Sequence, residues 1–281
     1  MIDSETESED RAQRTVTERI EREEFARGHI GPDEAPAEPR AASTIVLARE
    51  VHDSPFEVLL LKRPSTSRFA AGAFVFPGGT IDPGDAEPRL STRLPALGPN
   101  TEAAAVFAAL RELFEETGLL LTNKRPGAGE EVRVRQELLE DKLSFGAILE
   151  EHNLSFTALE VCYFARWITP TRFSRRYDTH FFLTTLPAEH TQFEPTLTDE
   201  IAGFVWLTPS RAIELFRGGR LPMLFPTRVT LQGLAEFGSI EEMVTVYRSR
   251  HIEPLTPRLV ISENSIRPVL PGDPEYKGAD V

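Results

Sequence analysis

The nine residues Arg111–Leu119, which read Arg-Glu-Leu-Phe-Glu-Glu-Thr-Gly-Leu, constrain most strongly what this chain can fold into. Side chains at positions i, i+3 and i+4 share one face of an α-helix, so Glu112, Glu115 and Glu116 meet on one side. The other face is apolar at helical spacing, and Gly118 follows as a C-cap. The sequence therefore predicts a core-anchored helix at about 101–117 that presents three carboxylates.

Three carboxylates on one helix face repel one another and weaken the helix slightly. A cation that prefers oxygen ligands, Mg²⁺ or Mn²⁺, would neutralise them, which makes Glu112, Glu115 and Glu116 candidate metal ligands. Arg111 lies one turn before Glu115 and can hold that carboxylate in place. A solvated charged surface produces the same pattern. Taken alone, the helix is equally consistent with a metal site and with solvated charge.

A basic, glycine-containing segment precedes the helix. Lys62, Arg63 and Arg68 follow an apolar strand-like run, and a second short strand then ends in Phe-Pro-Gly78-Gly79. Glycine has no Cβ, so the backbone at this turn can approach a ligand closely. We expect the three cations to line a basic entrance to the turn, although each one singly also fits ordinary surface charge.

Phe-Pro-Gly-Gly followed by Arg-Glu-Leu-x-Glu-Glu-x-Gly-Leu resembles the Nudix hydrolase signature, G-x5-E-x7-R-E-U-x-E-E-x-G-U with U aliphatic. Gly79 fits its first glycine, and residues 111–119 fit its second half. Gly79 and Arg111 are 32 positions apart, whereas the signature has 14, so a loop of 18 residues is inserted, mostly at 86–100. Asp85 stands where the signature has its first glutamate.

With its interrupted signature, the chain resembles one branch of that family, the coenzyme A diphosphatases related to the mammalian peroxisomal enzyme. That branch carries L-L-T-x-R-[SA]-x3-R-x3-G-x3-F-P-G-G before the helix, and residues 59–79 match its spacing throughout. Leu61 replaces the threonine and Pro64 replaces the serine or alanine. The resemblance spans about residues 43–276. It implies a Nudix fold of the α/β (α+β) class, with a mixed β-sheet sandwiched between α-helices.

Two further sites are candidates outside the signature. Arg175 and Arg176 lie on an expected loop between two core strands, where they can clamp phosphate oxygens or pair with Asp178 on the surface. In the family, an acidic residue outside the signature often completes the metal site or acts as the base. Glu200, just before an expected strand, is our candidate for that role, with a solvated carboxylate as the alternative.

Composition limits the other possibilities. The net charge is −13, which argues against nonspecific nucleic-acid binding, and no apolar run approaches the length of a membrane span. Residues 1–42 hold twelve Asp and Glu against six Arg and few apolar residues, so we expect an acidic, disordered tail, within which Thr15 to Ala26 could form a short charged helix. Residues 43–281 would then form the Nudix domain, with a C-terminal helical extension. We expect a cytoplasmic protein, monomeric or homodimeric.

The resemblance implies hydrolysis of the diphosphate linkage of a small nucleoside-diphosphate derivative, with coenzyme A or acyl-coenzyme A as the first choice. Glu112, Glu115 and Glu116 would hold Mg²⁺ or Mn²⁺, and Glu112 or Glu200 would take the proton of the attacking water. Lys62, Arg63, Arg68, Gly78, Gly79, Arg175 and Arg176 are the substrate-contacting candidates. ADP-ribose, NADH or a dinucleotide are alternative substrates, and a non-catalytic binding module is a further alternative.

Overall fold

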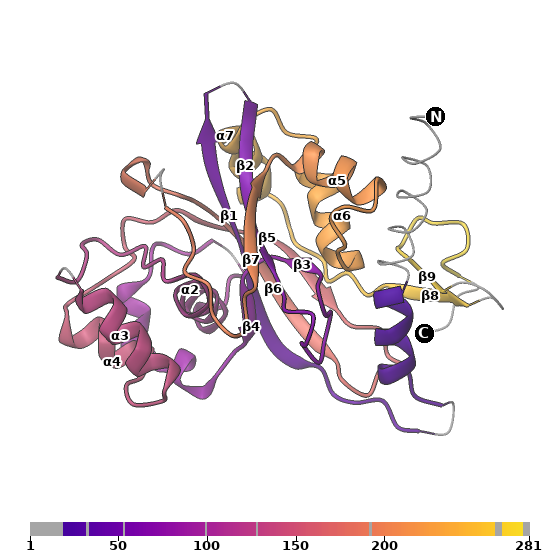
Figure 1. The fold of residues 1–281 in the computed structure, drawn as a ribbon, viewed down its shortest axis with the longest axis horizontal. Helices are drawn as coiled ribbons and strands as arrows, with labels where there is room; N and C mark the ends of the chain where they lie inside the picture. Colours follow the sequence, from indigo (N-terminus) through magenta and orange to yellow (C-terminus); the bar gives the residue numbers. More distant parts are fainter. Residues whose placement is uncertain are drawn as a thin grey trace.

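A mixed seven-stranded sheet runs through the centre of the computed structural model (Figure 1), which describes residues 19–31, 34–52, 54–98, 100–127, 129–190, 193–261 and 266–277. The main path is β3-β2-β1-β6-β5, with β4 paired to β1 and β7 to β2. β1 and β6 are parallel, and the other pairs are antiparallel. The strands are β1 Arg40–Val51, β2 Ser54–Lys62, β3 Phe74–Val75, β4 Gly78–Thr80, β5 Val161–Ile168, β6 Tyr177–Thr185 and β7 Gly203–Leu207.

Both faces of the sheet are covered, which explains why its central strands are apolar without interruption. Along β1, Ile45 and Leu47 enter one hydrophobic core, whereas Val46 and Ala48 enter a second core on the opposite face. All four side chains are fully buried. Successive side chains of a strand alternate between faces, so a continuous apolar run is what a doubly covered strand requires.

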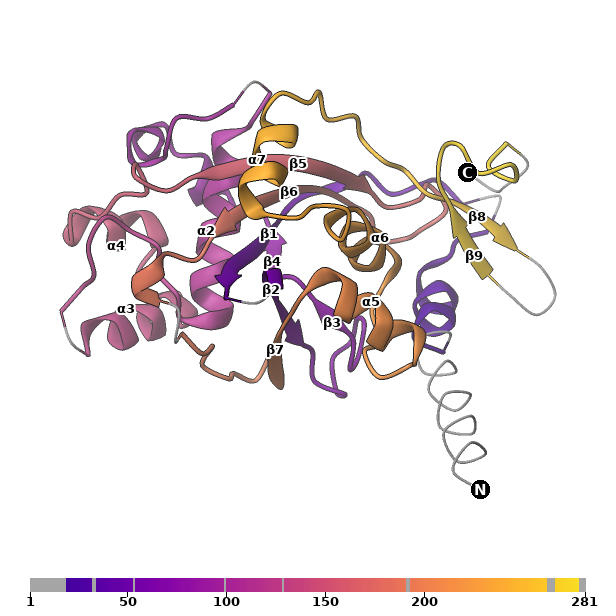
Figure 2. The ribbon, with the colours of Figure 1, turned by 90° about the horizontal axis from the view of Figure 1, so that it is seen from above.

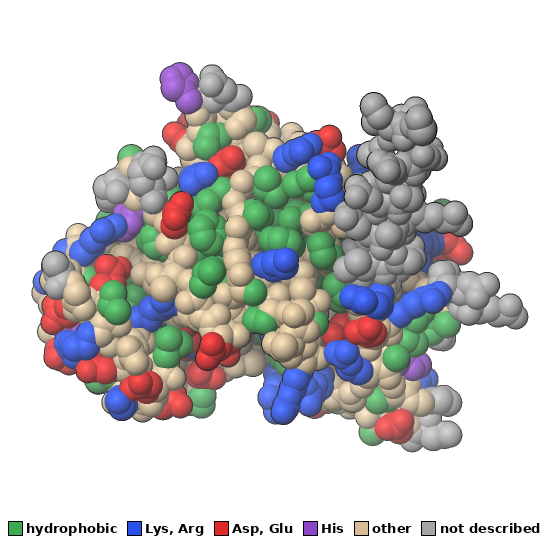
Figure 3. Space-filling model, viewed as in Figure 1, with side chains coloured by type: hydrophobic (Ala, Val, Ile, Leu, Met, Phe, Trp, Pro, Cys, Tyr) green, Lys and Arg blue, Asp and Glu red, His purple; other side chains and the backbone are tan. Residues whose placement is uncertain are grey.

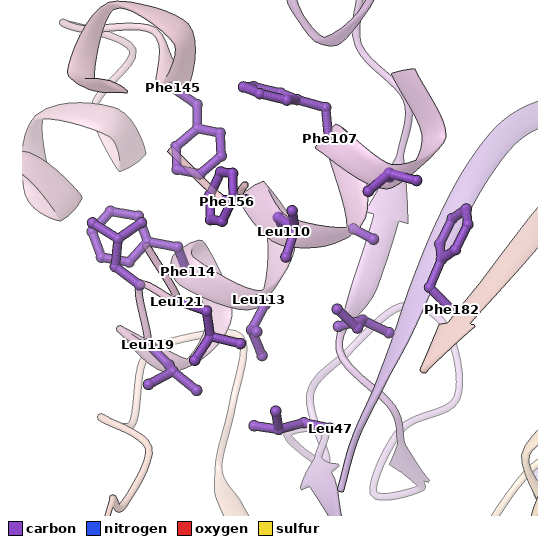
Figure 4. Packing of buried hydrophobic residues seen from close by; sticks show 14 of the residues in the cluster. Leu47, Phe107, Leu110, Leu113, Phe114, Leu119, Leu121, Phe145, Phe156 and Phe182 are labelled. Carbon is purple, nitrogen blue, oxygen red and sulfur yellow. The ribbon is translucent and has the colours of Figure 1, made fainter. Parts of the chain in front are cut away.

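The first core lies between the sheet and a layer formed by α2 Ala103–Thr117, α3 Glu130–Leu139 and α4 Phe145–Glu151. Figure 4 shows Phe107, Leu110 and Phe114 of α2 projecting into this core toward Phe145 and Phe156. The Phe107 and Phe145 rings are 5.3 Å apart in an edge-to-face arrangement. This packing fixes the rotation of α2 about its axis and therefore the direction of its polar face.

The second core is closed by α5 Pro209–Arg217, α6 Phe225–Leu234 and α7 Ile240–Arg248. Figure 2 shows the sheet seen from above, with α2, α3 and α4 on one side and these three helices on the other. A separate hairpin of β8 Arg258–Ile261 and β9 Ile266–Val269 lies near the C-terminus. The predicted class, a mixed sheet between helices, is confirmed. Within the described residues, no helix is long and apolar enough to cross a membrane.

The N-terminal segment differs from the expected disordered tail where the structure describes it. Residues 19–28 are helical, Ile20 is buried at 5% exposure, and β1 already begins at Arg40. The expectation fails there because Ile20 packs against Ala70 and Ala73, which low overall hydrophobicity does not reveal. Residues 1–18 of the expected tail lie outside the described residues.

The inserted loop and the helix start also differ from expectation. The insertion contains two 3-10 helices, η1 Pro83–Ala86 and η2 Pro88–Arg93, and its Leu90 and Leu94 are buried in the first core. It is therefore anchored rather than a free surface loop. Helix α2 begins at Ala103, two residues after the expected start at about 101, and Glu102 before it makes no side-chain cap bond.

Candidate functional site

Helix α2 places the acidic side chains of the site. Its apolar face is buried in the first core, and it ends at Gly118, which adopts the left-handed conformation (φ 81°) that a glycine C-cap allows. The C-cap was predicted from the sequence. The polar face of the last two turns is directed toward η1 and the β3–β4 turn. Residues 111–116 therefore meet the Pro-Gly-Gly segment despite the long insertion between them.

Arg111 is the centre of the charge network. It is 7% exposed, and its Nε and Nη2 donate to the buried Asp85 carboxylate at 3.0 Å each. Its Nη1 donates to Glu112 at 2.9 Å and to Glu115 at 3.1 Å, and its Nη2 also donates to the Thr80 carbonyl. Burial alone would lower the pKa of Arg111, but the Asp85 hydrogen bond and the neighbouring carboxylates outweigh it. Arg111 therefore stays charged and orients the acids around it.

Asp85 has a defined role that the sequence left unassigned. Its side chain is 3% exposed and forms an ion pair with Arg111 at 3.0 Å, although the two residues are 26 positions apart in the chain. It also accepts from the Asp82 backbone N–H and so closes the first turn of η1. Because both oxygens are occupied in these contacts, Asp85 acts here as the counter-ion of Arg111. Its position six residues after Gly79, where the signature has its first glutamate, was the available signal.

Glu116 and Glu112 lie against the two glycines. Glu116 Oε2 accepts from the Gly78 backbone N–H at 3.0 Å. A Cβ on Gly79 would lie 2.3 to 2.7 Å from the Glu112 carboxylate atoms, closer than any side chain tolerates. A side chain at position 79 would therefore displace the Glu112 carboxylate, which is the far end of a flexible side chain.

Burial and mutual repulsion shape the acidity of these groups. Burial raises the pKa of Glu116 to about 8, with the Glu112 charge acting in the same direction. Burial likewise raises the pKa of Glu112 to about 7 although Arg111 opposes it. The pKa of Glu115 is raised by burial as well, again against Arg111. Arg111 alone therefore does not compensate the buried negative charge.

Two other predicted residues act on Glu116 from outside the helix. The charge of Arg63 lowers the pKa of Glu116, and the charge of Glu200 raises it, so both lie within electrostatic reach of that carboxylate. Arg63 is half-buried, and its Nε donates to the Phe69 carbonyl at 3.0 Å. Glu200 is exposed, and its backbone N–H donates to Thr198 just before β7. The structure thus brings Arg63 and Glu200 to the same carboxylate.

The remaining predicted cations are placed differently. Lys62 and Arg68 are exposed, and the Lys62 ammonium lies 5.9 Å from the centre of the Phe74 ring. Arg175 is exposed on the loop between β5 and β6. Arg176 donates to the Thr169 carbonyl at 3.1 Å and to the Ala37 carbonyl at 2.9 Å. Arg176 therefore anchors the N-terminal segment, and no contact joins it to α2 among the described residues.

Sequence reasoning did not identify Arg135, which supports the C-terminal end of helix α2. Arg135 is 8% exposed and donates from Nε and Nη2 to the Glu115 carbonyl, at 3.1 and 2.7 Å. One guanidinium thus satisfies a carbonyl in the last turn of α2, where helices lack internal partners. Its position on α3 carries no motif, so no sequence signal was available.

The donor set fits a divalent cation in its chemistry. As the side chains stand, no group of three or more Asp, Glu, His or Cys in the described part of the chain converges enough to hold a metal ion. Arg111 Nη1 donates to Glu112 and Glu115, and the Gly78 N–H donates to Glu116. These hydrogen bonds hold the three carboxylates apart. The three carboxylates nevertheless carry more negative charge than Arg111 neutralises, and carboxylate oxygen is the ligand that Mg²⁺ and Mn²⁺ prefer.

Comparison with known proteins identifies relatives. A family model described as the NUDT19 Nudix domain matches residues 91–231, just over half of the chain. The acyl-coenzyme A diphosphatase NUDT19 of Gallus gallus is 29% identical over 291 residues, covering 79% of this chain and 75% of that protein. The Homo sapiens protein of the same name is 27% identical over 274 residues, covering 79% and 72%. The putative nudix hydrolase 7 of Caenorhabditis elegans is 27% identical over 243 residues, covering 84% and 74%.

A solved structure supports the same grouping. The crystal structure of a Nudix hydrolase from Alicyclobacillus acidocaldarius superposes with a TM-score of 0.64 at 26% sequence identity. The match covers 74% of this chain and 96% of that chain. Its helices and mixed sheet therefore correspond to the central fold described above.

Proposed function

The chain belongs to the Nudix family, in the branch described by the NUDT19 Nudix domain, and on that premise we propose that it is a metal-dependent hydrolase of coenzyme A derivatives. Three of the relatives carry the name acyl-coenzyme A diphosphatase. The observation that carries the proposal is the buried acidic group of Glu112 and Glu116 at the Gly78–Gly79 turn, held by Arg111.

Glu112, Glu115 and Glu116 would hold the cation, Mg²⁺ or Mn²⁺. When bound, such a cation polarises a phosphoryl oxygen and lowers the pKa of a water molecule. As they stand, Arg111 and Gly78 hold the three carboxylates apart, so these side chains would turn toward one another to hold the cation. Arg63 adds a positive charge beside Glu116 that suits the phosphates of the substrate.

The proposed reaction breaks one P–O bond of the diphosphate bridge and forms one P–O bond to water. For coenzyme A the products are 3′,5′-ADP and 4′-phosphopantetheine. The water proton passes to a carboxylate, for which Glu112 and Glu200 are the candidates. Lys62 and Arg68 extend the positive charge at the exposed end of the same segment.

The test is an assay of the full chain with coenzyme A, an acyl-coenzyme A, ADP-ribose, NADH and a dinucleotide. Each is incubated with Mg²⁺, with Mn²⁺ or with EDTA. Products are separated by chromatography, because the 3′-phosphate of coenzyme A would interfere with a phosphatase-coupled readout. We expect 3′,5′-ADP from the coenzyme A substrates, only with metal. Turnover in EDTA, or cleavage of none of the five substrates, would refute the proposal.

A further inference from the structure

The helix at residues 19–28 lies against the loop of residues 63–73, which we call the basic loop because it carries Arg63 and Arg68. This helix is the indigo one at the lower right of Figure 1, and Figure 3 shows Lys and Arg side chains (blue) gathered in the lower part of the same face. Ile20 packs against Ala70 and Ala73 of the loop. The N-terminal helix is thus attached to the segment that is expected to meet substrate.

Two polar side chains of this helix hold the loop backbone. Glu24 Oε1 accepts from the Ala70 backbone N–H at 2.9 Å. Glu24 also accepts from Arg27 Nη1 at 3.2 Å, and the same Nη1 donates to the Arg68 carbonyl at 2.8 Å. The Glu24 side chain is only 16% exposed, whereas Glu23 beside it is 48% exposed. The pair therefore bonds to two peptide groups on either side of Phe69.

The loop conformation needs such support. Ala70 has φ +50°, a left-handed conformation that side-chain-bearing residues other than Asn and Asp rarely adopt. Strained residues persist where surrounding contacts fix them. Ala70 is fully buried, its N–H bonds to Glu24, and its carbonyl accepts from Ala73 N–H. Among the described residues, Glu24 is the side chain that accepts from the backbone N–H of this strained residue.

Hydrogen bonds link the backbone around Ala70 to Arg63. Arg63 Nε donates to the Phe69 carbonyl, and the Arg63 backbone N–H donates to Ala73. Arg63 is the loop cation whose charge acts on Glu116. A shift of the Arg68–Ala70 backbone would therefore move the group that orients the Arg63 guanidinium.

We propose that Glu24 is a positioning residue: through Ala70 and Arg27 it fixes the basic loop, and so sets the affinity of the site for the phosphates of its substrate. The inference rests on the proposed function, because it assumes that Arg63 and Arg68 contact substrate. Glu24 itself touches neither substrate nor metal. Its removal should therefore weaken substrate binding and leave the chemistry on α2 unchanged.

The test compares four variants of the full chain with wild type on the substrate found active. Glu24→Ala should raise KM about tenfold and change kcat less than about twofold, as loss of one hydrogen bond to a binding loop predicts. Glu24→Gln keeps an acceptor oxygen for Ala70 N–H and should recover most of the affinity. Adding Ala70→Gly to Glu24→Ala should also lower KM, because glycine accepts φ +50° without strain.

Glu23→Ala is the matched control, since it removes the same charge from the exposed side of the same helix. Tryptic cleavage after Arg68 supplies a second readout without substrate, and Glu24→Ala should be cut faster there than Glu23→Ala. Equal KM values, or equal cleavage rates, for these two variants would overturn the inference. An inactive wild type would instead refute the proposed function, while the cleavage comparison still decides whether Glu24 holds the loop.

Discussion

Replacing Glu116 by glutamine is expected to abolish turnover and, in metal-free protein, to raise stability. Glu116 is buried at 7% exposure, and its pKa is raised from 4.5 to about 8, mainly by burial. Because the native state then holds this proton more tightly than the unfolded state, stability falls as pH rises from about 4.5 to 8. At 1.36 kcal/mol per pH unit, the cost reaches about 3 kcal/mol at pH 7 as an upper value.

Glutamine has the same shape, carries no charge and can still accept from Gly78 N–H. Side-chain relaxation and water entry reduce the upper value, so we expect Glu116→Gln to be about 1–3 kcal/mol more stable at pH 7 in EDTA. Loss of one metal ligand should lower kcat at least about a hundredfold under saturating Mg²⁺.

The assay is urea unfolding of both proteins at pH 5, 6, 7 and 8 in EDTA, repeated with Mg²⁺. The stability difference should widen with pH, and Mg²⁺ should stabilise wild type more than the variant, because a ligand that binds only the native state adds stability. Glu151→Gln, at the exposed end of α4, is the control and should show neither effect. A variant less stable than wild type at pH 8, or a difference independent of pH, would refute the electrostatic reasoning.

Three further changes test other parts of the site and the core. Gly79→Ala should lower kcat about tenfold or more by displacing Glu112, measured against Gly84→Ala, where an added Cβ meets nothing within 4 Å; equal rates would contradict the close approach. Asp85→Asn should cost about 2–4 kcal/mol in urea unfolding, since it removes the best-buried partner of a buried guanidinium; a loss below about 0.5 kcal/mol would show the pair to be unimportant. Cys162, the single cysteine, is buried and its pKa is raised to about 11, so a thiol reagent at pH 8 should modify it only as fast as the chain unfolds.

Periodicity and motif spacing predicted the local structure of the site well. The amphipathic pattern located helix α2 within two residues, and Gly118 was identified as its C-cap. The Phe-Pro-Gly-Gly run was expected to let a ligand approach its backbone, and the group that lies against Gly79 is the Glu112 carboxylate. The helix and its cap depend on neighbours within a few positions in the chain. Local propensity therefore suffices to predict them.

Long-range partners were not predictable in the same way. Asp85 pairs with Arg111 across an insertion that itself folds back into the core through Leu90 and Leu94. Arg176 was expected to clamp phosphate oxygens or to pair with Asp178, yet it bonds to the Ala37 carbonyl, because the chain before β1 passes beside it. An arginine is read from sequence as a cation with five donors. Which carbonyl or carboxylate satisfies them depends on tertiary structure.

The N-terminal helix illustrates why composition misled the prediction there. Its residues are mostly charged, which is typical of disorder, and a single apolar side chain, Ile20, enters a small core. Hydrogen bonds hold the segment, because Glu24 and Arg27 bond to backbone groups of the basic loop. Gly28 also lies so close to the Phe173 ring that a Cβ there would come within 2.8 Å. Hydrogen bonds to backbone leave no compositional trace. A charged segment can therefore be ordered by hydrogen bonds to the loop against which it lies, here the basic loop. Such bonds are found from the tertiary structure and not from the composition of the segment.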